Sequence, residues 1–273
     1  MAADEPSPGV QRPTKKYVIK QTLFMFLLLS DEAKAGRLSL FVRHYEPLSY
    51  LPQHATRTSH SRMKRYAADI GDTRVRFKAY GRDLRLVLRR DRSAFSNDFV
   101  ATDSKGFINL DLSHIYSGTL EGDPGSRVFG SLINGVFNGR ISTGDSQEFF
   151  VEPSWKYFNK TQSQRVGHSV IYSGKDVHLP AHLEAHRGCD LDLLQIPETR
   201  DWPTVRQHNV IVDHVLYNYY RRNSDDASAK AYLTNIVASH VNTATTIYSS
   251  TDFGGIVGIK FIVQSLKANL RKN

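Results

Sequence analysis

Two histidines and one cysteine are spaced as zinc ligands could be. In His182-Leu-Glu-Ala-His186 the two imidazoles are four residues apart, and Cys189 follows three residues later. On a helix these side chains would share one face, and nitrogen and sulfur donors suit zinc. Zinc peptidases of the His-Glu-x-x-His type need a glutamate directly after the first histidine, and this sequence has Leu183 there. The pattern therefore favours surface histidines over a self-contained metal site.

A basic cluster predicts a cut in the chain itself. Arg62, Lys64 and Arg65 stand in the order Arg-x-Lys-Arg, which secretory proprotein convertases cut. The acidic pockets of these enzymes need clustered cations on an exposed, extended segment, and the polar residues 56–61 suit such a loop. The alternative is an ordinary solvated basic turn.

The other short motifs are weaker. Asn159-Lys-Thr161 is an N-glycosylation sequon, which matters only if the chain is secreted. Asp252-Phe-Gly254 resembles the magnesium motif of kinases, but no His-Arg-Asp loop precedes it. The glycine-rich region contains no Gly-Lys-Ser/Thr, so it is not a phosphate-binding P-loop.

Length and composition indicate a folded body. The chain has 273 residues, of which 40% are hydrophobic and 23% charged, and a single cysteine. These values exclude wholesale disorder and collagen, and they allow one large domain or two small ones. One thiol cannot form an internal disulfide, which excludes a disulfide-stapled scaffold.

The positive charge is concentrated in one stretch. Twelve basic and four acidic residues lie between Arg57 and Arg92, giving +8 of the net charge of +9. Cations alternate with apolar residues in 74–80 and 84–88, which predicts a hairpin with one wet face. Few aromatics interleave with the charges, so no nucleic-acid partner is expected. Polyanion binding through Arg74, Arg76 and Arg89 stays a weak alternative.

The amino terminus has the order of a secretory signal. Lysines precede the apolar run 23–29, and Ala33-Lys-Ala35 has the small-x-small form of a signal-peptidase site. We therefore expect a signal peptide over residues 1–35 and passage through the secretory pathway. The apolar run is too short to span a bilayer, and an ordinary buried strand or helix is the alternative.

Residues 36–200 are expected to form a β-rich antiparallel domain, either a sandwich or a distorted barrel. Between residues 107 and 172, short apolar or β-branched runs alternate with glycine-containing turns. Asn134-Gly135 and Asn138-Gly139 are the strongest hairpin signals. Strands are predicted over 107–112, 136–137, 140–142, 148–151 and 168–172.

The pattern changes after a linker placed at residues 201–208. We predict a strand over 210–220, an N-cap within 224–226, a helix over 227–248 and a second strand over 256–263. This is one β-α-β unit, expected to be parallel. Two strands and one helix do not make a complete sheet domain, so residues 209–273 are expected to be the first part of an incomplete α/β domain.

Read together, several segments resemble one protease family. They match the ADAM (a disintegrin and metalloproteinase) proteases of the Kuzbanian type, in order along the chain from about Val42 to Val263. The matching strings are Arg43-His-Tyr-Glu46, Lys64-Arg65, Ser113-His-Ile-Tyr116, Val151-Glu-Pro153, His168-Ser-Val-Ile-Tyr172, Gly188-Cys-Asp190, Asp213-His214, Ser239-His-Val241 and Thr251-Asp-Phe253.

The resemblance implies a zymogen, with an inhibitory prodomain followed by the start of a zinc metalloprotease domain. It also implies that Cys189 is the inhibitory ligand to a zinc ion held by the rest of the protease. A thiolate in the open zinc position would displace the water that the metal activates. The resemblance further implies a membrane-anchored cell-surface sheddase, with a proprotein convertase and Notch-type receptors among its partners.

The sequence departs from the family at three points. It lacks the His-Glu-x-x-His-x-x-Gly-x-x-His zinc signature, so no catalytic residue is expected in this chain. No dibasic pair lies between Gln195 and Asn209, and a cysteine expected before Asp213-His214 is missing. One alternative is a stand-alone secreted prodomain that acts in trans as an inhibitor or chaperone.

Overall fold

The computed structural model describes residues 42–50, 72–178, 205–253 and 255–268. The expected signal peptide, the basic cluster at Arg62, Lys64 and Arg65, and Cys189 with its neighbouring histidines lie outside these residues. The predictions made for them therefore stay predictions.

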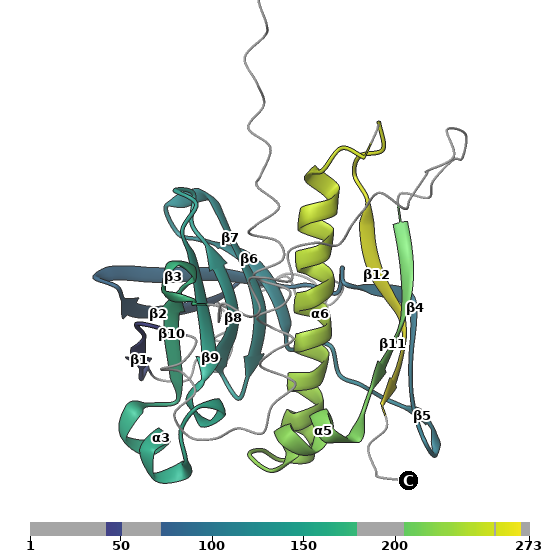
Figure 1. Cartoon of the computed structure of the whole chain (residues 1–273), viewed down its shortest axis with the longest axis horizontal. Coiled ribbons are helices and arrows are strands. Elements are labelled where there is room, and N and C mark those ends of the chain that lie inside the picture. The colour runs from purple at the N-terminus through teal and green to yellow at the C-terminus, as the bar shows by residue number, and fades with distance from the viewer. Residues whose placement is uncertain (1–41, 51–71, 179–204, 254, 269–273) are drawn as a thin grey trace, which may run out of the picture. The chain divides into compact units, whose positions relative to one another are not determined.

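Eight strands form one antiparallel sheet, which we call the barrel sheet. Its order is β1-β10-β9-β8-β7-β6-β3-β2, and every neighbouring pair is antiparallel. The sheet curves into a nearly closed barrel, which confirms the predicted β-rich antiparallel domain (Figure 1). The strands are β1 (Glu46–Leu48), β2 (Thr73–Ala79), β3 (Arg82–Arg90), β6 (Ile115–Leu120), β7 (Asp123–Ile133), β8 (Val136–Ser142), β9 (Glu148–Pro153) and β10 (Ser169–Ser173).

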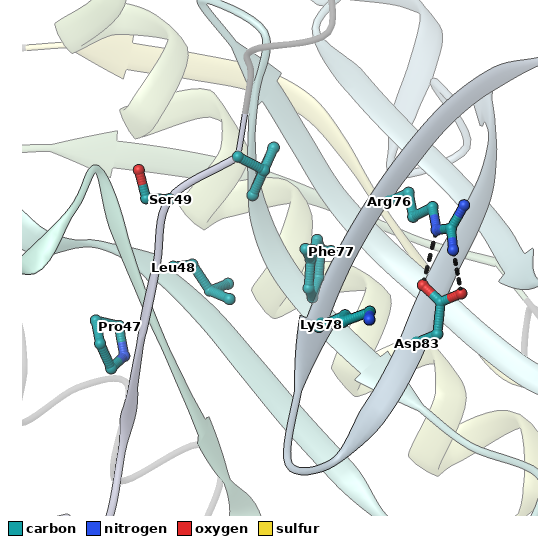
Figure 2. Close-up of a pocket in the computed structure, with 8 residues that line it drawn as sticks. Pro47, Leu48, Ser49, Arg76, Phe77, Lys78 and Asp83 are labelled. Atoms are coloured by element: carbon teal, nitrogen blue, oxygen red, sulfur yellow. Dashed lines mark hydrogen bonds and ion pairs between the residues drawn. The ribbon is translucent and has the colours of Figure 1, made fainter.

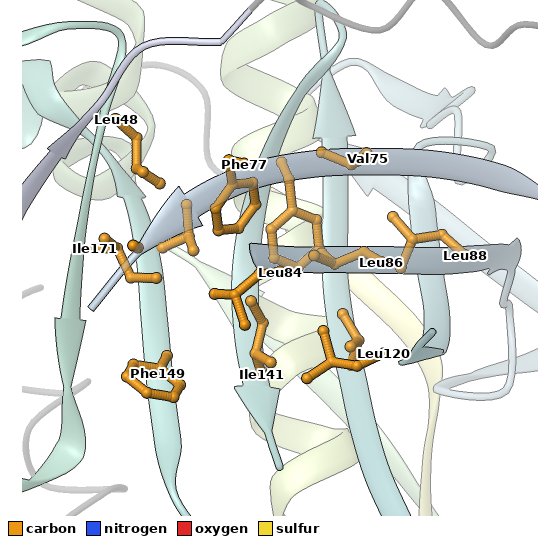
Figure 3. Close-up of a cluster of buried hydrophobic side chains, with 14 of the residues drawn as sticks. Leu48, Val75, Phe77, Leu84, Leu86, Leu88, Leu120, Ile141, Phe149 and Ile171 are labelled. Atoms are coloured by element: carbon orange, nitrogen blue, oxygen red, sulfur yellow. The ribbon is translucent and has the colours of Figure 1, made fainter. Parts of the chain in front are cut away.

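The inner face of the barrel sheet holds a continuous apolar core. Along β2, buried residues alternate with exposed ones from Thr73 to Ala79, as the period of two in the sequence predicts. Side chains from opposite strands meet in the interior, among them Leu84, Leu86, Ile141 and Phe149 (Figure 3). Burial of these side chains is the main source of stability for this part of the chain.

Side-chain hydrogen bonds link β1 and β2, the two end strands of the barrel sheet. The backbone N–H of Tyr80 donates to Glu46 Oε2 at 2.7 Å, and its hydroxyl accepts from the Ser173 N–H at 3.1 Å. The same hydroxyl donates to Asp176 Oδ2 at 3.0 Å. Burial, together with Asp176 and Glu46, raises the pKa of Tyr80, so the phenol stays neutral. Tyr80, directly after β2, thus joins the end of β2 to the paired strands β1 and β10, with which β2 shares no ladder among the described residues.

Only one of the two predicted Asn-Gly turns is a turn. Asn134 and Gly135 have φ angles of 52° and 76° and connect β7 to β8. Asn138 and Gly139 lie inside β8, so the prediction of a turn there is wrong. A Cβ on Gly139 would lie 2.6 Å from the Cα of its cross-strand partner Gly130. The second glycine therefore serves close strand approach rather than chain reversal.

Residues 205–268 form the predicted parallel β-α-β unit. Strand β11 (Val205–Val212) pairs in parallel with β12 (Lys260–Ala268). Between them run α5 (His214–Arg221) and α6 (Asp226–Ser250). The α6 N-cap is Asp225, whose side chain accepts from the Ser228 N–H at 2.8 Å, within the predicted capping stretch.

Three boundaries of this unit differ from the prediction. The first strand begins at Val205, inside the predicted linker 201–208, rather than at Val210. Residues 213–220 were expected to continue the first strand, but they form α5 because Asp213 caps a helix by accepting from the Leu216 N–H at 2.9 Å. The second strand begins at Lys260 rather than Ile256, after the positive-φ residue Gly258. The strand expected over 107–112 also ends early, at Ile108.

The incomplete sheet is extended by strands that the sequence analysis did not assign to it. Strand β4 (Phe95–Asp103) pairs in parallel with β12, and β5 (Gly106–Ile108) pairs antiparallel with β4. The result is a four-stranded sheet of order β11-β12-β4-β5, which we call the mixed sheet (Figure 1). Residues on both sides of the predicted linker therefore share one sheet.

Short elements complete the described structure. They are η1 (Ser154–Lys156), α3 (Lys160–Val166) and η2 (Gly174–Asp176).

A substitution at Gly118 tests how closely β6 packs against β3 in the barrel sheet. A Cβ on this residue would lie 2.0 Å from the carbonyl oxygen of Val87 in β3. We expect Gly118→Ala to lower the free energy of unfolding by about 1–3 kcal/mol, measured by urea titration. Gly174→Ala is the control, because its Cβ would meet only ordinary contacts of 3.5 Å or more. Equal stability of the two variants would contradict this packing.

Candidate functional site

One of the predicted modification residues lies within the described structure. Asn159 is exposed and is the N-cap of α3, where its Oδ1 accepts from the Gln162 N–H at 2.9 Å. A glycan would be joined to the other atom of the amide, Nδ2, so capping and modification are compatible. Glycosylation at Asn159 stays a prediction.

The described residues contain no assembled metal centre. Across 42–50, 72–178, 205–253 and 255–268, no three His, Cys, Asp or Glu side chains come together as ligands. Within the same residues, no helix combines the length and the hydrophobicity needed to cross a lipid bilayer.

A cavity of about 400 Å³ opens between β1 and the β2–β3 hairpin (Figure 2). Arg76 and Asp83 form a bidentate ion pair at this cavity, with N···O distances of 2.8 and 2.7 Å. The remaining lining residues are Pro47, Leu48, Ser49, Tyr50, Phe77 and Lys78. These residues combine apolar packing with an ion pair. Such a lining is typical of the place where the two end strands of a curved sheet approach each other, rather than of a catalytic centre.

Carboxylates neutralise much of the basic hairpin. Asp83 accepts from both Arg76 and Arg85, and these arginines hold the pKa of its carboxyl below the usual value. Arg89 pairs with Asp72 at 2.6 Å in the same way. Two of the three arginines considered for polyanion binding thus already have partners, which weakens that alternative.

The most extensive candidate site is an intramolecular interface between residues 72–178 and residues 205–268. Three sets of contacts form it: an aromatic cluster at η1, a polar set along α6, and the β4–β12 ladder. Sequence analysis placed the two parts in order along the chain but identified none of these contacts.

The first set, the aromatic–lysine cluster, comprises Glu152, Trp155, Lys156, Tyr219, Tyr220 and Tyr232. Trp155 contacts all three tyrosines, with ring centroids 5.4 to 5.9 Å apart. Tyr220 and Tyr232 stack at 5.5 Å. Helices α5 and α6 therefore present a tyrosine surface into which η1 inserts one indole, an arrangement typical of interface anchors.

A nearly buried ion pair lies beside this indole. Lys156 Nζ is 2.8 Å from Glu152 Oε1, and the two side chains are only 11% and 13% exposed. Burial acts to lower the pKa of Lys156, but the Glu152 carboxylate and nearby tyrosines outweigh it and raise that pKa. The ammonium group also lies 6.0 Å from the centre of the Tyr220 ring.

The Glu152 carboxylate has three hydrogen-bond partners within residues 156–172. It accepts hydrogen bonds from the hydroxyls of Tyr157 and Tyr172 as well as from Lys156. Because three donors, one of them a cation, contact the carboxylate, its charge is tolerated away from bulk water. The ion pair thereby holds the Lys156 side chain in place against Tyr220 of α5.

The second set of contacts joins α6 to the residue before β6 and to the turn between β7 and β8. His114 Nε2 lies 2.9 Å from the hydroxyl of Thr234, and Asn134 Nδ2 donates to Ser228 Oγ at 3.3 Å. Burial lowers the pKa of His114, and Asp111 partly opposes this shift. The imidazole is therefore neutral where it meets the helix.

The third set is the ladder between β4 and β12. Val100, Ala101 and Thr102 stand opposite Ser265, Leu266 and Lys267 in parallel register. The Val263 N–H donates to the Ala94 carbonyl at 2.8 Å, just before β4 begins. Sequence signals for β4 were weak, because Asn97, Asp98 and Asp103 interrupt its apolar residues.

Comparison with known proteins gives relatives along most of the chain. It is 31% identical over 283 residues to human disintegrin and metalloproteinase domain-containing protein 10, covering 90% of this chain and 36% of that protein. For the Xenopus laevis protein of the same name the identity is 29% over 287 residues, covering 91% and 37%. The Caenorhabditis elegans homolog is 26% identical over 282 residues, covering 83% and 30%.

The chain belongs to the disintegrin and metalloproteinase family. It spans about a third of the length of the curated relatives that it matches. No family model matches the sequence. The family relationship predicted from the ordered motifs is thus confirmed.

Removal of one partner tests the ion pair of the cluster. Lys156→Met leaves Glu152 nearly buried without its cation, so we expect a loss of about 3 kcal/mol in the free energy of unfolding. The double variant Lys156→Met/Glu152→Gln removes both charges and should recover most of this loss. Urea titration of both proteins checks the prediction, which fails if the double variant is no more stable than the single one.

Protonation of His114 tests the α6 contact. Because its pKa is lowered on folding, the unfolded chain binds the proton more readily, and stability falls as pH drops below the ordinary value of about 6.5. His168 and His240 shift in the same direction through burial. We expect His114→Gln to reduce, without abolishing, the fall in thermal midpoint between about pH 7.5 and pH 5.5. Identical pH slopes would contradict this role.

Proposed function

We propose that the chain is part of a membrane-anchored zinc metalloendopeptidase, an ectodomain sheddase of the cell surface. In this proposal residues 36–200 are the prodomain and residues 209–273 the first part of the protease domain. The support is the family relationship, together with the names of the relatives, which describe metalloproteinases. Notch-type receptors and other cell-surface proteins would be the substrates.

The observation that carries a latency role is the interface across the linker. A segment that only assisted secretion would not need a tryptophan inserted among tyrosines of the following segment, or a strand paired into its sheet. Contacts of this kind allow the prodomain to hold the protease part in one arrangement. They favour cis inhibition, and the same non-covalent surface supports the alternative of a prodomain that acts in trans.

Cys189 would complete the inhibition. Zinc, when bound in the protease domain, supplies a Lewis acid that activates a water molecule. The chain offers one soft donor for it, the Cys189 thiolate, and the remaining ligands would come from parts of the protease outside these 273 residues. Held at the metal, the thiolate would exclude this water.

A proprotein convertase would recognise the cluster of Arg62, Lys64 and Arg65 and cut the chain once after it. This cut would begin activation in the secretory pathway. The β2–β3 hairpin follows this cluster directly, so the cut would divide the segment between β1 and β2. Because β1 pairs with β10, it would stay attached by its ladder after the cut.

A chimera tests the latency proposal. We would join this chain to the remaining protease domain of the human relative and measure cleavage of a fluorogenic peptide. We expect Cys189→Ser to raise the activity of the uncut chimera at least tenfold, and Ser104→Ala, in an exposed turn, to leave it unchanged. In the cobalt-substituted chimera, a thiolate-to-metal charge-transfer band should depend on Cys189. The proposal would be overturned if the Cys189→Ser chimera stayed inactive and kept that charge-transfer band.

A further inference from the structure

The β4–β5 hairpin is an excursion from the barrel sheet. The strands on either side of it in sequence, β3 and β6, are direct neighbours, with Leu86 opposite Leu120 and Arg90 opposite Tyr116. The barrel sheet is therefore continuous without residues 91–114. The Asp91 N–H donates to the Ile115 carbonyl at 3.0 Å and closes the base of the excursion.

The excursion finds its hydrogen bonds in the mixed sheet. Strand β12 pairs with β11 on one side and with β4 on the other, so both of its edges are used. Among the described strands, β4 is the one that satisfies the N–H and C=O groups along this edge of β12. Addition of a strand to such an edge is a common way to bind an extended segment.

Side chains add specificity to this ladder. Ala94, Phe95 and Ala101 are buried on the hairpin side. Val263, Leu266 and Ala268 are buried on the β12 side. On the opposite face of β4, Val100 is 39% exposed, so one face is packed and the other is partly open. Beyond β4 the sheet ends in the three-residue strand β5, whose Phe107 is 85% exposed.

We propose that the β4–β5 hairpin is a docking arm whose receptor is the edge of β12. Through it, residues 72–178 and 205–268 hold each other by strand addition, without the chain connection between them and without Cys189. The biological meaning of this arm rests on the proposed prodomain–protease relationship, but its geometry does not. The ligand that the β12 edge recognises is a parallel strand with small and aromatic residues on one face.

Engineered disulfides test the register in the full chain. In a Cys189→Ser background, Thr102→Cys/Lys267→Cys places two thiols at paired positions of the ladder. A matched control, Thr102→Cys/Ser265→Cys, moves one thiol two residues along β12, beyond the reach of a disulfide. We expect oxidation to link the first pair at least tenfold more than the second, as read by non-reducing gels and peptide mass spectrometry. Equal linking, or none in the first pair, would overturn the docking arm.

Cutting the chain tests whether the arm holds. A site for a sequence-specific protease is inserted between residues 178 and 205 of the Cys189→Ser protein, and the cut product is run on a size-exclusion column. We expect the two fragments to co-elute, and Ala101→Asp, which buries a charge against β12, to separate them. Val100→Asp, on the partly exposed face, should leave them together. Separation of the unsubstituted fragments would overturn the proposal.

The two proposals can fail separately. The paired disulfide and the effect of Ala101→Asp on co-elution report on β4 and β12, whereas latency is read from the activity of the Cys189→Ser chimera. A linked, co-eluting chain with no effect of Cys189 on activity would leave the docking arm standing and remove the latency mechanism.

Discussion

The backbone ladder between β4 and β12 is the interaction on which the arrangement of this chain depends. Every N–H and C=O group taken out of water needs a partner, and among the described strands β11 supplies them along one edge of β12 and β4 along the other. The hairpin from the first part of the chain meets this need. One sheet is thereby built from segments separated by more than a hundred residues, so the two parts cannot be treated as independent domains.

The aromatic–lysine cluster reinforces this coupling by a different physical means. The ladder is directional and sets register, whereas Trp155 and the tyrosines of α5 and α6 contribute apolar contact area that excludes water. Lys156 brings a charge into that environment, which is tolerable only because Glu152 neutralises it and is itself satisfied by two phenols. Because the buried charges need these particular partners, η1 is held in one arrangement against α5 and α6.

The family relationship and the interface give complementary support for a zymogen. The relatives are metalloproteinases by name, and the chain spans about a third of their length. The interface shows how the part before the linker engages the part after it through contacts that need no cysteine. Inhibition by Cys189 would then depend on this engagement, since a thiolate coordinates a metal effectively only when its segment is held nearby.

Local sequence patterns predict the alternating strands of the barrel sheet, the capped helix α6 and the parallel β-α-β order, because each follows from a short hydrophobic period or a cap. The sequence also determined the family, through motifs kept in order. It misassigned Asn138-Gly139 and residues 213–220, where a glycine pairing and an aspartate cap decide the outcome. The pairing of β4 with β12 rather than with the barrel sheet, and the contacts of Trp155 with Tyr220 and Tyr232, emerge only in the folded chain. Those contacts depend on partners far away in the chain, which no local pattern encodes.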